Sequence, residues 1–170
     1  VDSYTMVKEG DITYIRPYLK SMTREEVLEI YGDYLSLLSE EERERQIASL
    51  MNPQPDPSLP NCEIEIIHLD IPYEKTASQE RAELESQWEI TEAVAGNRIT
   101  FSMRNGQEWD SPVEVRDYIS DEQGGCFRIT SRYYLEAAEG HGARFAAMVD
   151  TFAVIPPQEG ADSILDDDAP

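Results

Sequence analysis

The clearest hydrophobic pattern of the chain lies between residues 126 and 155. In its first part, apolar side chains alternate with polar ones, the period of two that is typical of a β-strand with one solvent-exposed face. The alternating apolar residues are Phe127, Ile129, Tyr133 and Leu135. A turn over residues 139–142, centred on His141, would set residues 143–155 against this strand, with apolar residues on both faces. The pattern predicts a long β-hairpin whose second strand is covered on both sides.

Residues 23–51 show the pattern of two amphipathic helices. Thr23 and Ser39 are each followed three residues later by a glutamate, which is the capping-box spacing of a helix start. The apolar residues after Thr23 follow the spacing of one helical stripe, at Val27, Tyr31, Tyr34, Leu35 and Leu38. The second helix would bury Ile47, Leu50 and Met51. We expect these helices to pack on the sheet and to cover the second strand of the predicted hairpin.

The other alternating segments predict an antiparallel meander. Residues 62–71 have the composition of a strand that ends at Pro72, and residues 88–91, 99–103 and 113–119 alternate between apolar and polar side chains. Asn105 and Gly106 predict a two-residue hairpin turn, because both positions tolerate a positive φ. Residues 107–109 would then begin the second strand of that hairpin.

The chain between the helices and the meander contains four prolines within residues 53–60. Proline has no N–H donor, so this stretch predicts an extended connection within one domain. We therefore expect a single α+β domain over residues 1–157, with N-terminal helices packed on an antiparallel β-meander sheet. Residues 158–170 end in a run of aspartates, which predicts an acidic, disordered tail.

The charge balance narrows the possible partners. The 170 residues include 35 acidic and 14 basic side chains, for a formal net charge of −21. Nucleic-acid phosphates and anionic lipid surfaces would be repelled, which argues against nucleic-acid binding and against peripheral membrane binding. An acidic surface that keeps the protein dissolved explains most of this charge, and a docking face for a basic partner is the functional alternative.

The start of the chain bears on localisation. It begins at Val1 rather than Met, and no apolar run reaches the roughly 18 residues of a membrane span. We expect a segment upstream, such as a signal peptide or a membrane anchor, and this expectation favours an extracytoplasmic location.

Two cysteines, Cys62 and Cys126, are too few for a disulfide scaffold and lack a CxxC spacing. One disulfide between them in an exported protein and two free thiols in a cytosolic protein are both consistent with the sequence.

Motifs that would carry catalytic chemistry are not evident. There is no glycine-rich phosphate loop, and His68 and His141 are the only histidines, too few for a zinc site built on them. Acidic residues around predicted loops are candidates for Ca²⁺ ligands, although they lack the EF-hand spacing; they are Asp110, Asp117, Asp121 and Glu122. We predict no catalytic residue and no cofactor.

Residues 125–132, Gly-Cys-Phe-Arg-Ile-Thr-Ser-Arg, followed by a turn and the apolar stretch 143–155, resemble the closing hairpin of minor pilins and of the pseudopilins of type II secretion. This resemblance covers about 30 residues of the chain. It implies an upstream membrane-anchor helix, an antiparallel sheet packed on a helix, and a role in subunit assembly without catalysis.

The same order of elements is similar to the cystatin-like folds that include relatives of nuclear transport factor 2. Proteins of that kind often dimerise through the sheet and hold a small ligand inside a curved, cone-shaped sheet. The candidate pocket residues under this alternative are Trp88, Phe101, Tyr118 and Phe127.

The sequence therefore favours a non-enzymatic interaction or assembly domain that binds a protein partner or a second copy of itself. The soluble head of a pilin-like subunit would be one such domain. A ligand-binding or enzymatic cone is the alternative. Fold resemblance alone does not decide between them.

Overall fold

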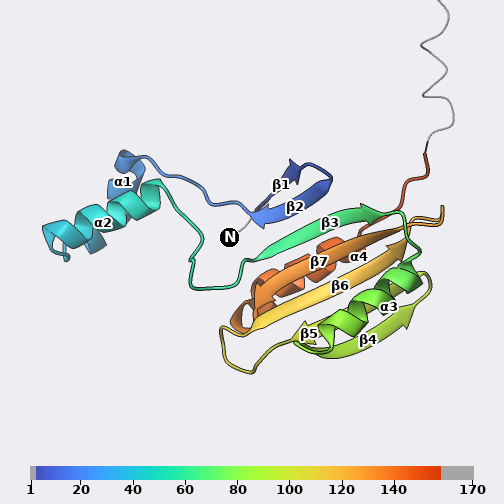
Figure 1. Cartoon of the computed structure of the whole chain (residues 1–170). Coiled ribbons are helices and arrows are strands. Elements are labelled where there is room, and N and C mark those ends of the chain that lie inside the picture. Colours follow the sequence, from blue (N-terminus) through green and yellow to red (C-terminus); the bar gives the residue numbers. More distant parts are fainter. Residues whose placement is uncertain (1–2, 158–170) are drawn as a thin grey trace, which may run out of the picture.

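A seven-stranded antiparallel sheet forms the centre of the protein, in the order β1-β2-β3-β7-β6-β5-β4 (Figure 1). The computed structural model describes residues 3–157. The strands are β1 (Tyr4–Glu9), β2 (Ile12–Pro17), β3 (Glu63–Leu69), β4 (Glu89–Ala95), β5 (Arg98–Arg104), β6 (Pro112–Ser120) and β7 (Cys126–Tyr134). The helices are α1 (Arg24–Leu35), α2 (Glu40–Met51), α3 (Tyr73–Leu84) and α4 (Ala143–Asp150). The α+β class and the antiparallel sheet predicted from the sequence are confirmed.

The strands β4 to β7 form the predicted meander, and β3 adds to its far side by pairing with β7. Helix α3 connects β3 to β4, which have three strands between them in the sheet, by crossing one face of the meander (Figure 1). The predicted tight turn at Asn105 and Gly106 is wrong in its length, because β6 begins only at Pro112 after a longer loop.

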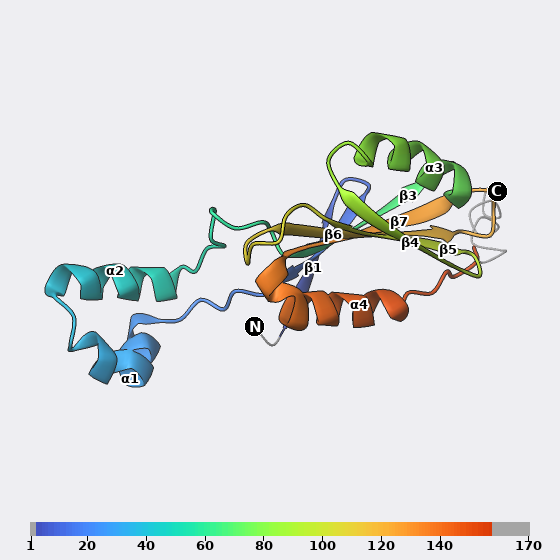
Figure 2. The ribbon, with the colours of Figure 1, turned by 90° about the horizontal axis from the view of Figure 1, so that it is seen from below.

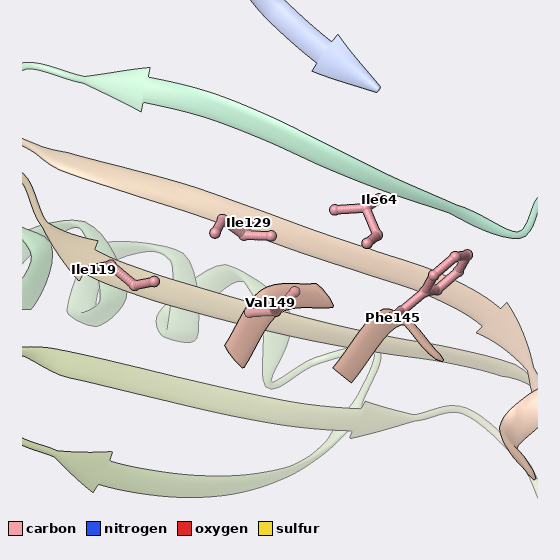
Figure 3. Close-up of a cluster of buried hydrophobic side chains, with 5 residues drawn as sticks. All are labelled: Ile64, Ile119, Ile129, Phe145 and Val149. Carbon is pink, nitrogen blue, oxygen red and sulfur yellow. The ribbon is translucent and has the colours of Figure 1, made fainter. Parts of the chain in front are cut away.

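Each face of the sheet carries one helix. Helix α3 lies over β4 to β7 on one face and α4 lies on the opposite face, as Figure 2 shows edge-on. Beneath α4, five buried residues from three strands and the helix meet in one cluster: Ile64, Ile119, Ile129, Phe145 and Val149 (Figure 3). This cluster is the core that joins the C-terminal helix to the central strands.

The predicted hairpin over residues 126–155 is wrong in its second half. Residues 126–134 form β7, but the chain then passes through a 3₁₀ turn and a short π-helical segment into α4. Phe145 and Val149 are four residues apart, so a helical period explains their shared burial as well as a period of two does. Three alanines within eight residues favour the helix.

Helices α1 and α2 begin one residue after Thr23 and Ser39, and both capping boxes are formed. Their predicted place on the sheet is not observed. The two helices pack against each other and project from one end of the sheet (Figures 1 and 2). We call residues 23–52 the helical hairpin. Helices α3 and α4 supply the cover that was expected from α1 and α2. The predicted acidic tail, residues 158–170, lies outside the described residues.

The anchoring role of α4 can be tested at Phe145, which is fully buried. Phe145→Ala should lower the free energy of unfolding by about 3–5 kcal/mol, because it removes an aromatic side chain and leaves a cavity between α4 and the sheet. Chemical denaturation followed by circular dichroism measures this change. Tyr18→Ala, at a half-exposed aromatic residue, is the matched control and should change stability by no more than about 0.5 kcal/mol. Equal effects at the two positions would contradict the assigned packing.

The two cysteines allow a second test. Cys126 begins β7, whereas Cys62 lies against the backbone of Tyr134 at the other end of that strand. Nine extended residues separate these positions by roughly 26 Å, far beyond the reach of a disulfide. Both cysteines are free thiols.

Under native conditions a thiol reagent should modify Cys62, which is partly exposed, and spare Cys126, which is fully buried. Denaturation should make both thiols reactive, as measured by the mass of the modified chain. A chain in which neither thiol reacts after denaturation without a reductant would contradict this assignment.

Candidate functional site

The helical hairpin has a small core of its own. Three buried residues, Val27, Leu35 and Ile47, meet between its helices, and Met22, Leu38 and Leu50 pack around them. None of these six residues belongs to the two clusters on the sheet. The hairpin is therefore held together mainly by contacts within itself.

Polar contacts close the hairpin at both ends. Arg24 donates two hydrogen bonds to Glu44, at 2.6 and 2.9 Å, across the two helices. At the turn, Arg43 donates to the backbone carbonyl oxygens of Leu35 and Leu38. The Arg43 guanidinium thus links the start of α2 to the end of α1 and to the turn between the helices.

Large apolar side chains remain exposed on this hairpin. Of the twelve exposed large hydrophobic residues in the described part of the chain, six lie here: Leu28, Ile30, Tyr31, Tyr34, Leu37 and Met51. Single exposed apolar residues are common on protein surfaces, but a concentration of them on one small element is typical of a binding surface.

Three carboxylates of the hairpin have a pKa below the ordinary value. The backbone N–H of Thr23 lowers the pKa of Glu26, and the Ser39 hydroxyl lowers the pKa of Glu42. The guanidinium of Arg24 lowers the pKa of Glu44. The exposed apolar side chains therefore lie on an element with a strongly acidic surface.

A second notable feature is a network of arginines and glutamates on the sheet face that carries α3. Glu80 of α3 accepts hydrogen bonds from Arg116 of β6, from the Tyr118 hydroxyl at 3.0 Å and from Arg128 of β7 at 2.7 Å. Although burial opposes its charged form, nearby Glu114 and Glu80 raise the pKa of Arg116. Glu80 thus joins α3 to two central strands.

The network continues across the sheet. Arg132 of β7 lies between Glu63 of β3 and Glu114 of β6 in the strand register, and it donates to Glu114 at 3.0 Å and to Glu65 at 2.9 Å. Arg16 of β2 donates to Glu63 at 3.0 Å. Every carboxylate here already accepts a hydrogen bond from an arginine, so the network is suited to holding the strands together rather than to proton transfer.

A cavity of about 520 Å³ lies at the base of the helical hairpin. It is lined by the ends of β2 and β7 and by the proline-rich segment, and it includes Cys62 and His141. Burial raises the pKa of the Cys62 thiol and lowers the pKa of His141. Both groups are neutral at pH 7, so they lack the thiolate and imidazolium of an activated cysteine nucleophile.

The structure brings together three of the four residues predicted to line a cone. Phe101 and Tyr118 are buried under α3 with their ring centroids 5.2 Å apart, and Trp88 packs against the same cluster. Phe127 lies on the opposite face, where it packs against Phe152 and His68. None of the four lines the cavity at the base of the helical hairpin or a second cavity of about 300 Å³ beside β4 to β6.

The four Ca²⁺ candidates do not form one cluster. Asp117 is buried and accepts hydrogen bonds from Arg98 and Thr100 on the α4 side of the sheet. Asp121 contacts His68 at 2.7 Å and accepts the backbone N–H groups of two neighbouring loop residues. Asp110 lies in the loop before β6, and Glu122 follows that strand. Within residues 3–157, no group of three or more His, Cys, Asp or Glu side chains is placed to hold a metal ion.

The comparisons with known proteins do not assign a family. No protein-family model matches the sequence, and a search of curated proteins found no significant relative. None of the described helices combines the length and the apolar composition that crossing a membrane requires. The function must therefore be inferred from the surfaces themselves.

The network around Glu80 predicts a distinct alkaline titration. Burial, and secondarily the Glu80 carboxylate, raise the pKa of Tyr118 well above its ordinary value. Because the folded state favours the neutral phenol, the resulting stabilisation is fully present below about pH 10 and is lost as the pH rises through the folded pKa.

Absorbance at alkaline pH should show tyrosines that ionise late, among them Tyr133, whose pKa burial also raises, and Tyr118→Phe should remove the latest of these steps. Tyr34→Phe, at an exposed tyrosine, is the control and should leave this latest step in place. A titration whose latest step is unchanged in Tyr118→Phe would contradict the assignment.

Proposed function

We propose that the protein is a non-enzymatic interaction domain that binds a partner protein through its helical hairpin. The observation that carries the proposal is the concentration of exposed apolar side chains on α1 and the following turn, led by Ile30 at 65% exposed and Leu37 at 83% exposed. The hairpin projects away from the sheet, so a partner has access to it (Figure 1).

The sheet acts as the scaffold in this proposal. Its two faces carry α3 and α4, and the ion-pair network between Arg132 and its glutamate partners favours one strand register. The resemblance to minor pilins would make subunit assembly one form of this function, but residues 143–150 of the stretch that carries it form helix α4 rather than a strand, so the proposal does not depend on it.

Site-specific photo-crosslinking in the native host cells tests this proposal. A photoreactive amino acid at Leu37 should give a discrete adduct, because the side chain at this position would lie within the interface. The same probe at Val94, which is 67% exposed on β4, is the control and should not give that adduct.

The variant Ile30→Ser should abolish the Leu37 adduct while leaving the circular dichroism spectrum unchanged. Its control is Val94→Ser, at an exposed apolar residue outside the helical hairpin. The proposal is wrong if Leu37 gives no adduct, or if both probes give the same adduct irrespective of Ile30.

A further inference from the structure

Three exposed apolar residues of the helical hairpin form one continuous stripe. Ile30, Tyr34 and Leu37 are spaced by four and three residues, which places them along one side of α1 and of the turn that follows it. They are 65%, 55% and 83% exposed, whereas Val27 and Leu35 face α2 and are buried. Helix α1 is therefore apolar toward α2 and also along a second side.

A two-helix hairpin can bury only one of these two sides. Its helices have 12 residues each and a core of three fully buried side chains, which gives limited independent stability. A third helix laid along the second side would complete a three-helix bundle. An amphipathic helix presents apolar residues with the spacing of this stripe, so it is the secondary structure that fits.

Acidic side chains border the stripe. Glu26 precedes Ile30 by four residues and Asp33 precedes Leu37 by four, so these carboxylates form a parallel row next to the apolar one. Glu29 adds a third carboxylate on the same exposed surface. Between residues 24 and 51 the hairpin has eight acidic and three basic side chains.

The three arginines of the hairpin are engaged within it. Arg24 pairs with Glu44, Arg45 pairs with Glu41, and Arg43 donates to the backbone carbonyls at the turn. Glu29 and Asp33 have no ion pair within the described residues. The charge beside the apolar stripe is thus left for a partner to neutralise.

We propose that the helical hairpin binds a cationic amphipathic helix of another protein, with apolar residues on the Ile30–Tyr34–Leu37 stripe and lysines or arginines opposite Glu29 and Asp33. This inference rests on the proposed function and specifies the chemistry of the partner. Charge complementarity selects this occupant over the alternatives.

The other possible occupants carry the wrong charge. A second copy would bring two acidic hairpins together within a chain of net charge −21. The last thirteen residues of the chain contain five carboxylates and no basic side chain. Anionic lipid surfaces attract amphipathic helices with a basic polar face, which is the reverse of this surface.

Three synthetic peptides of about 18 residues, long enough for a marginal helix, test the inference with the full chain. The first has a leucine stripe with i, i+3 and i+4 spacing flanked by lysines. The second keeps the stripe and replaces lysine with glutamate, and the third keeps the composition of the first but scatters its leucines. Fluorescence anisotropy measures binding, and amide chemical-shift changes locate it.

The first peptide should bind at the helical hairpin at least about tenfold more tightly than either control, and added salt should weaken it. Ile30→Ser combined with Leu37→Ser should weaken binding at least about tenfold, since two buried apolar contacts are lost. Val94→Ser, at an exposed apolar residue outside the helical hairpin, is the control and should leave binding unchanged.

A second pair of variants measures the contribution of the carboxylates to peptide binding. Glu29→Gln combined with Asp33→Asn should weaken binding roughly three- to tenfold. Glu83→Gln combined with Glu89→Gln removes the same charge from exposed positions outside the hairpin and should have no effect.

Several results would overturn the inference. If the glutamate peptide binds as tightly as the lysine peptide, charge does not select the partner. If the peptide with scattered leucines binds as tightly as the lysine peptide, charge alone selects the partner and the apolar stripe has no role. Self-association or binding to anionic vesicles that Ile30→Ser abolishes would assign the stripe to another occupant. If the Leu37 crosslink is nevertheless found in cells, the proposed function stands and only the cationic helix is wrong; if the crosslink is also absent, both fail.

Discussion

The pairing of arginine and glutamate across the central strands is the interaction on which the sheet depends. Strand β7 carries arginines and threonine on the α3 side and apolar residues on the α4 side. A shift of its register by one residue would turn Arg128 and Arg132 into the core under α4 and would leave Glu63, Glu65 and Glu114 without their partners. Both penalties act together, so a single register is strongly favoured.

This arrangement also explains how a protein with such a large negative charge folds. The carboxylates in the network are largely shielded from solvent and are matched by nearby guanidinium groups. The unmatched carboxylates lie elsewhere, including Glu29 and Asp33 on α1. The sheet thus neutralises much of its own charge, whereas the hairpin presents unneutralised charge next to apolar side chains. This contrast separates the scaffold from the surface that we propose to be functional.

Local signals in the sequence predicted the starts of α1 and α2, because the capping boxes at Thr23 and Ser39 involve only neighbouring residues. The strands of the meander were also predictable from their alternation. Helix α4 was not, because the spacing of Phe145 and Val149 satisfies both a strand and a helix in a short segment. Choosing between them required knowledge of what the segment packs against.

The candidate site was harder to predict than the fold. The sequence does not single out Ile30 and Leu37, because the apolar stripe through Val27 and Leu35 is sufficient to predict helix α1. A sequence also does not show which apolar side of a helix packs within the chain and which side remains exposed. The alternating charges of β7 resembled an ordinary solvent-exposed face, since their glutamate partners come from distant parts of the chain. Three of the four predicted cone residues do lie together, but in a packed core under α3. Phe127 lies on the other face of the sheet, because successive residues of β7 alternate between the two faces.

The order of the strands has a consequence for biosynthesis. Strand β3 pairs with β7, which is made only after most of the chain has been synthesised, whereas the core of the helical hairpin is complete once residue 50 has emerged. Contacts between nearby residues form faster than pairings between distant ones, and domains begin to fold while the ribosome is still translating. We therefore expect the hairpin to take shape on the nascent chain before the sheet can close, so that a partner has the chance to meet it during translation.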